Sequence, residues 1–238
     1  MILAVQIKVL EDQDGVPQDG RPEPTAAQRA VERSLARRRG AVADEVERLI
    51  GAAFELIRDS GELGPRVSEI VARAGLSNQA FYRHFRSKDE LLAAVLDAGI
   101  QQLADYVEHR MAKAADPLDA VRAWLRGVLA QTLDPQAARA TRPFALGRGR
   151  LADEHPEEVA RSQRRLTGPL RTVIAAAVEA GQLPAGTDPE LGAEALYLLA
   201  IGWLEARLAG GGATSEAAAQ LESFALAGLG AGGAARGA

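Results

Sequence analysis

The chain has no cysteine, and this absence excludes disulfide bonds and metal sites built from cysteine. Only three histidines occur, and His84 has no second histidine or carboxylate at a spacing typical of metal ligands. The glycines near Gly210 do not follow a predicted strand, as those of a phosphate-binding loop would. These absences argue against an enzyme, and we expect neither a cofactor nor a metal.

Aromatic residues are also scarce, at 4% of the 238 residues, and no apolar run is long enough to span a membrane. The apolar first ten residues lack a basic lead and are followed by Glu11 and Asp12, unlike a secretory signal. We therefore expect a cytoplasmic protein. Apolar residues make up 47% of the chain, and alanine and leucine, which are strong helix formers, dominate its long segments. This composition favours an all-α fold.

The segment from Val67 to Leu91 has the pattern of a helix-turn-helix motif. Apolar residues at positions i, i+3, i+4 and i+7 predict its first helix, and they are Val67, Ile70, Val71 and Ala74. Gly75 can adopt the left-handed conformation that ends a helix, and Ser77 can cap the next one. Phe81 and Phe85, four residues apart, form the buried side of the second helix.

The opposite face of this second helix is predicted to be polar and basic, and it carries Asn78, Gln79, Tyr82, Arg83 and His84. Gln79 can bond with N6 and N7 of an adenine, and Asn78 can do likewise from the same first turn. Between Arg73 and Lys88 there are four basic residues and no acidic one, in a chain of net charge −4. Such local positive charge favours DNA phosphates. The alternative is an ordinary helical hairpin with a solvated basic face.

Two further helices are expected before this motif. Thr25 and Gln28 form a capping box for a short basic helix that ends at Gly40. Its arginines, among them Arg37, Arg38 and Arg39, either contact DNA as an arm or belong to a solvated tail, and the sequence favours neither. A stronger amphipathic helix from Ala41 to Ser60 completes a three-helix core, in which we expect Phe54 to contact Phe81 and Phe85. Residues 1–24 are predicted to be a disordered lead.

After the motif, helical patterns continue to about Leu229. The first, from Ser87 to Met111, runs without a break out of the predicted DNA-binding unit. One is expected to start at Pro117 and to carry core residues as far as Leu129, others are expected at 134–151, 156–181 and 189–208, and a last one ends near 229. Gly168 and Pro169 predict a kink or break in the helix expected at 156–181. Residues 231–238 are predicted to be a flexible tail.

The motif resembles the DNA-binding segment of the TetR family of bacterial transcriptional regulators. The matching residues are Ile70, Ala74, Gly75, Leu76, Ser77, Tyr82, His84, Phe85, Ser87, Lys88 and Leu91. Within this pattern Val71 stands where the family usually has alanine and Leu76 where it usually has valine. Arg66 stands where a threonine usually caps the first helix of the motif. The resemblance covers Ala41 to Leu91, and the remainder agrees with the family only in length and helical layout.

The resemblance implies a helix-turn-helix DNA-binding domain at 41–88, preceded by a lead and arm at 1–40. It also implies a helical ligand-binding and dimerisation domain at 89–230. Tyr82, His84 and Lys88 match positions that contact phosphate in the family. The expected function is that of a repressor, a homodimer released from double-stranded operator DNA by a small, mostly apolar effector. An architectural DNA-binding protein without a ligand is the alternative.

The sequence offers candidate residues for the effector site and for the dimer interface. Large side chains on separate helices are the candidates for the effector site, and they are Tyr106, Trp124, Phe144, Leu146 and Trp203. Each of them fits an ordinary core better than a ligand contact. Alanine-rich faces on the helices at 156–181 and 189–208 suit a four-helix dimer interface, although the same faces suit an internal core.

Overall fold

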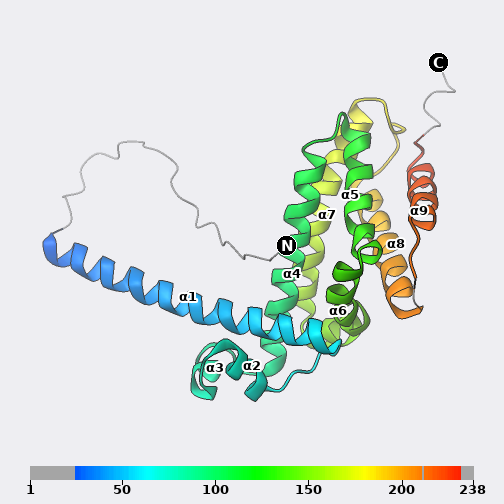
Figure 1. Cartoon of the computed structure of the whole chain (residues 1–238). Coiled ribbons are helices and arrows are strands. Elements are labelled where there is room, and N and C mark those ends of the chain that lie inside the picture. Colours follow the sequence, from blue (N-terminus) through cyan, green and yellow to red (C-terminus); the bar gives the residue numbers. More distant parts are fainter. Residues whose placement is uncertain (1–24, 211, 232–238) are drawn as a thin grey trace. The chain divides into compact units, whose positions relative to one another are not determined.

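Side chains at the helix starts set most of the boundaries of the fold. The computed structural model describes residues 25–210 and 212–231, and over these ranges the chain forms nine α-helices and no strand (Figure 1). The expected all-α fold is therefore confirmed. The predicted disordered lead and most of the predicted tail lie outside the described residues. Within the described part, no helix is long and apolar enough to cross a membrane.

The nine helices are α1 (Ala26–Ser60), α2 (Val67–Ala74), α3 (Asn78–His84), α4 (Lys88–Met111), α5 (Pro117–Leu133), α6 (Pro135–Glu154), α7 (Pro156–Glu179), α8 (Pro189–Gly210) and α9 (Ser215–Gly228). Helices α4 to α8 pack against one another as a bundle, and α9 packs against α5 (Figure 1). The chain divides into two units, one up to Ala43 and one from Asp44 onward. The described residues of the first unit belong to α1 and its cap, and their side chains are exposed.

The helix end predicted at Gly40 and the break predicted at Pro169 are wrong, because the helices continue through both residues, whereas the kink expected at Pro169 stays a prediction. Helix α1 passes Gly40 without ending, since a single glycine costs a helix only about 1 kcal/mol and Arg39 and Ala41 beside it are good helix formers. Helix α7 likewise continues through Pro169. Leu166 and Leu170, on either side of this proline, are buried in the same core, and their burial opposes a break.

The helix-turn-helix is built on a small apolar core, which we call the N-terminal core. Its most buried members include Leu49 and Ile57 of α1, Ile70 of α2 and Phe81 of α3, all 0% exposed. Leu151 of α6 belongs to the same core and is also 0% exposed. A helix of the bundle therefore contributes directly to the core that holds the motif.

Phe54 has a different aromatic neighbour from the one expected. Its ring stacks on that of Phe144 of α6, with centroids 6.4 Å apart, while Phe81 and Phe85 pair with each other at 5.9 Å. The expected contact relied on helix periodicity. Periodicity predicts on which side of its helix a residue lies, but not which other helix packs against that side.

Candidate nucleic-acid interface

The second helix of the motif, α3, is fixed at its start and along one side. Ser77 caps it by accepting a hydrogen bond from the backbone N–H of Ala80 at 3.1 Å. Gly75 ends the preceding helix with φ of +63°, in the left-handed conformation that its lack of a side chain permits. Phe81 is fully buried and Phe85 nearly so, and α3 therefore presents its other face outward.

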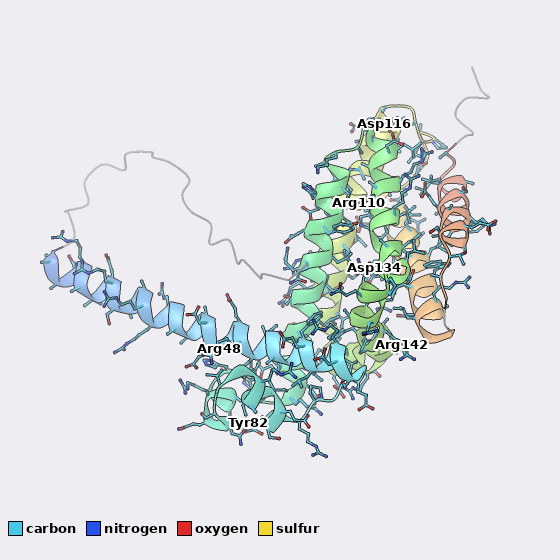
Figure 2. All side chains as sticks on the ribbon, in the orientation of Figure 1. Arg48, Tyr82, Arg110, Asp116, Asp134 and Arg142 are labelled. Carbon is cyan, nitrogen blue, oxygen red and sulfur yellow. The ribbon has the colours of Figure 1, made fainter. Side chains whose placement is uncertain are left out.

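The outward face of α3 contains the side chains that were expected to read bases. Asn78 and Gln79 are exposed in its first turn. Tyr82 is 62% exposed, and its ring packs edge-on against Phe81 at 5.1 Å between centroids. In Figure 2, Tyr82 lies at the edge of the α2–α3 pair. Phe81 thus holds the ring of Tyr82 in place, and the Tyr82 hydroxyl can reach a phosphate of bound DNA.

His84 does not face outward as expected. Its side chain is only 6% exposed, and its Nε2 lies 2.6 Å from Oε2 of Glu45, on α1. The prediction was wrong because the helical pattern of α3 does not show that a carboxylate of another helix covers its last turn.

Glu45 interacts with two consecutive residues of α3. Its Oε2 also lies 3.5 Å from Nη1 of Arg83. The hydrogen bond with His84 is the main cause that lowers the pKa of the Glu45 carboxyl, and the nearby charges of Arg83 and Arg48 act in the same direction. The carboxylate is thus ionised at neutral pH and holds the end of α3 against α1.

Arg48, one turn further along α1, fixes the other half of the motif. Its guanidinium donates hydrogen bonds to the backbone carbonyls of Ala74 and Gly75, where α2 ends (Figure 2). The carbonyls at a helix end have no partner within the helix, and an arginine can satisfy them. The start of α2 is held by Glu69, whose side chain accepts a hydrogen bond from the N–H of Arg66 at 2.9 Å. Arg66 therefore occupies the cap position without a threonine hydroxyl.

Acidic residues of α1 reduce the positive charge that the motif presents. Arg73 pairs with Glu55 at 3.0 Å and with Asp59 at 3.6 Å, as Arg83 pairs with Glu45. Arg86 is exposed and Lys88 half-buried, and neither has an ion pair within 4.0 Å in the described part of the chain. Of the four cations counted in the sequence, these two have no acidic partner, and Arg83 is paired but 57% exposed.

The arginines of the predicted arm lie in the other unit. Arg37, Arg38 and Arg39 follow one another on the N-terminal part of α1, and all three are exposed. The apolar residues Val31 and Leu35 on this part are 58% and 46% exposed. The arm is thus helical and unburied, and its contact with DNA stays a prediction.

The structure does not bring all five candidate effector residues together, although Trp124 and Trp203 both pack in the bundle core. Trp124 is fully buried and donates a hydrogen bond from its Nε1 to the carbonyl of Leu166 at 3.0 Å. Phe144 packs on the N-terminal core, Leu146 and Tyr106 are 49% and 41% exposed, and Trp203 is half-buried beneath Arg207. Their role in binding an effector stays a prediction.

Two hollows of the described residues lie elsewhere, on the outer surface around α5. One of about 420 Å³ lies between α5 and α9, and one of about 310 Å³ lies between α5 and the end of α4. Both are open, and none of the five candidate residues lines them. In the described ranges, no group of three or more histidine, aspartate or glutamate side chains is placed to hold a metal ion.

Sequence reasoning missed the residues of α1 that position the motif. Glu45 and Arg48 lie 39 and 26 residues from the partners to which they bond. No local pattern marks such distant pairs. Their spacing of three residues on one helix face was the only available signal, and it is common on solvated helices.

Comparison with known proteins finds sequence similarity in the same part of the chain, the helix-turn-helix segment. Residues 49–95 match the family model described as bacterial regulatory proteins of the tetR family. Over 78 residues the chain is 36% identical to the HTH-type transcriptional regulator BetI of Rhizobium meliloti (strain 1021). This match covers 33% of the chain and 38% of BetI, so the chain spans little more than a third of that relative.

Solved structures share the fold over a longer range. The regulator FadR of Bacillus subtilis, in complex with stearoyl-CoA, superposes with a TM-score of 0.64 at 16% identity. The superposition covers 77% of this chain and 98% of FadR. AibR, in complex with isovaleryl coenzyme A and operator DNA, gives a TM-score of 0.55 at 20% identity, over 78% of this chain and 97% of AibR. At such identities the likeness shows the fold alone.

Proposed function

Through its helix-turn-helix segment the chain belongs to the TetR family of bacterial transcriptional regulators, and we propose that it is a ligand-responsive repressor. In this proposal it binds a palindromic operator in the cytoplasm as a homodimer, and a small, largely apolar effector releases it. The observation that carries the proposal is the exposed polar face of α3, held in place by α1 while Phe81 and Phe85 are buried.

The proposed DNA contact follows from this geometry. The first turn of a recognition helix reaches base edges in the major groove, and Asn78 and Gln79 are exposed there. Tyr82, Arg83 and Lys88 lie where they can meet the flanking phosphates, and Arg37 to Arg39 add contacts through the arm. Of the phosphate contacts that the family suggests, His84 is the one whose side chain is buried.

The proposed dimer uses α8 and α9. Leu191 and Leu198 of α8 are 64% and 53% exposed, and Phe224 of α9 is 69% exposed. Gly202 lies on the same side of α8, one turn beyond Leu198, and has open space around it, which allows another helix to approach closely. On α7, by contrast, Leu166, Leu170 and Ile174 are buried within the chain. We therefore propose the α8–α9 pair as the interface, in place of the α7–α8 pair expected from the sequence.

The effector is proposed to act through the helices that join the bundle to the N-terminal core. Leu91, Leu92 and Val95 near the start of α4 and Leu151 of α6 are buried in that core. A ligand that separates the bundle helices therefore displaces residues on which the motif rests. Acyl thioesters are the first ligand class to test, because FadR and AibR, which share the fold, were solved with stearoyl-CoA and isovaleryl coenzyme A.

The test measures operator affinity by fluorescence anisotropy while stearoyl-CoA, isovaleryl-CoA and a panel of apolar metabolites are added. An effector should weaken DNA binding by about 5- to 150-fold, and DNA should weaken effector binding by the same factor. Coenzyme A without an acyl group is the control for its charge. A ligand that binds free and DNA-bound protein equally well contradicts the sensor role. Sequence-specific binding without any effector favours the architectural alternative.

A further inference from the structure

The last turn of α3 is attached to α1 by a bond that the DNA-binding role does not use directly. His84 is the final residue of α3, and its Nε2 lies 2.6 Å from Oε2 of Glu45. Its side chain is 6% exposed, and that of Glu45 is 26% exposed. To contact a phosphate, the imidazole would have to break this bond and leave its covered position.

The surroundings of the pair are consistent with a fixed anchor. Arg83 and Arg48 are the other charged groups near the Glu45 carboxylate, and both are cations that hold it ionised. Arg48 in turn bonds the end of α2. Two residues one turn apart on α1 therefore hold the final residues of both helices of the motif, Glu45 at α3 and Arg48 at α2.

We propose that His84 is a positioning residue for base recognition and not a phosphate contact, and that it acts through Glu45. The first turn of α3 meets the bases, and the bond at its last turn limits the tilt of the helix. A small tilt there displaces the amide of Gln79, whose bidentate pairing with a base depends on geometry. This role rests on the proposed DNA-binding function and adds a residue to its specificity.

The test compares wild type, His84→Asn, Glu45→Gln and the double variant. Anisotropy titrations measure affinity for the operator selected by the wild type and for the same site with one base pair changed at the position read by Gln79. Titrations at several salt concentrations are run at pH 6, where free imidazoles are largely protonated, and at pH 8. Lys88→Ala serves as the matched control for removal of a phosphate contact.

A positioning role predicts that each single variant lowers the affinity ratio of the two sites by about threefold or more, and that the double variant lowers it no further than the larger single effect. The slope of log affinity against log salt should stay that of the wild type at both pH values. Lys88→Ala should reduce that slope by about 0.9 and leave the ratio unchanged.

Two results overturn the role of His84. One is a slope reduced by about 0.9 in His84→Asn at pH 6 with an unchanged ratio, which identifies a phosphate contact. The other is an unchanged affinity ratio of the two sites in a folded Glu45→Gln variant. This variant retains the imidazole, so the test stays decisive if His84→Asn does not fold. If the wild-type protein selects no DNA sequence, the proposed function itself is contradicted. If wild type discriminates between the two sites and the variants keep the same affinity ratio, only the positioning role of His84 is contradicted.

Discussion

The polar side chains at the start of α3 and α4 differ in what they can recognise. Gln79 offers an amide that pairs with a base, whereas Lys88 offers a single charge that meets any phosphate. Gln79→Ala should therefore lower discrimination against altered sites by about 1–3 kcal/mol. Lys88→Ala should weaken binding to every sequence alike. Titrations against the selected operator and its single-base variants measure both effects, and an equal loss on all sites in Gln79→Ala would show that Gln79 does not read bases.

The Glu45 carboxyl gives the motif a defined pH dependence. Its pKa lies below the ordinary value of 4.5, mainly because of the hydrogen bond with His84. A carboxyl with a lowered pKa stabilises the folded state above its ordinary pKa, and this contribution is lost as the pH falls through the lowered value. Glu45→Gln should therefore lower the unfolding temperature at pH 7, and the difference from wild type should shrink toward pH 3.

Circular dichroism melts at pH 7, 5 and 3 measure this difference, with Glu62→Gln as the matched control. Glu62 is exposed, and its side chain has no ion pair in the described ranges, so its variant should follow wild type at every pH. A Glu45→Gln difference that stays constant from pH 7 to pH 3 would show that the carboxylate does not stabilise the fold.

At the scale of helices, the sequence predicts what depends on near neighbours. Gly75, Ser77 and Asp116 mark the helix boundaries found in the structure, because a cap bonds to backbone groups two or three residues away. The exposure of Asn78 and Gln79 followed from the same local pattern. The helix end expected at Gly40 and the break expected at Pro169 were wrong, because packing and flanking helix formers outweigh one unfavourable residue.

The close approach of α4 and α5 depends on one glycine. A Cβ at Gly127 would lie 2.6 Å from Cγ1 of Val107, which is 1% exposed and stiff because it is β-branched. Gly127→Ala should lower the free energy of unfolding by about 1–3 kcal/mol. Gly99→Ala is the control within α4, since nothing lies near its Cβ, and it should gain up to about 1 kcal/mol. Denaturant unfolding measures the free energy of unfolding of both variants. A Gly127→Ala variant as stable as wild type would mean that α4 and α5 have room to separate.

The arginines at the N-terminal part of α1 test whether this helix contacts DNA. Replacing Arg37, Arg38 and Arg39 by glutamine keeps good helix formers and removes three charges. The slope of log affinity against log salt should fall by about 0.9 for every phosphate that an arginine no longer neutralises. Arg161→Gln with Arg164→Gln on α7 is the control for general charge. An unchanged slope in the triple variant would make the arm a solvated helix.

At the scale of the whole molecule, the effector site was the least predictable feature. Trp124, Phe144 and Trp203 are all large residues on predicted helices, but the structure places Trp124 in the bundle core, Trp203 at the edge of that core and Phe144 against the N-terminal core. Which aromatic residues meet depends on how all the helices pack, and periodicity within each helix carries no such information. For the same reason the sequence did not indicate that α6 contributes Leu151 to the core of the motif.

The exposed apolar side chains of α8 and α9 should hold two copies together. Phe224→Asp and Leu198→Asp each place a charge on the proposed interface, and we expect either variant to sediment as a monomer while wild type sediments as a dimer. Leu146→Asp is the matched control, because Leu146 is a 49% exposed leucine on α6. Monomeric wild type, or dimeric variants, would contradict the α8–α9 interface.

Selection of bound fragments from random duplex DNA tests the central claim most directly. Two identical α3 helices entering successive major grooves require half-sites about 34 Å apart and related by a two-fold axis. We predict that wild type enriches one such palindrome and that Phe224→Asp loses this enrichment while remaining folded. Binding with no preferred sequence, or enrichment of a single asymmetric half-site by a monomer, would contradict the account.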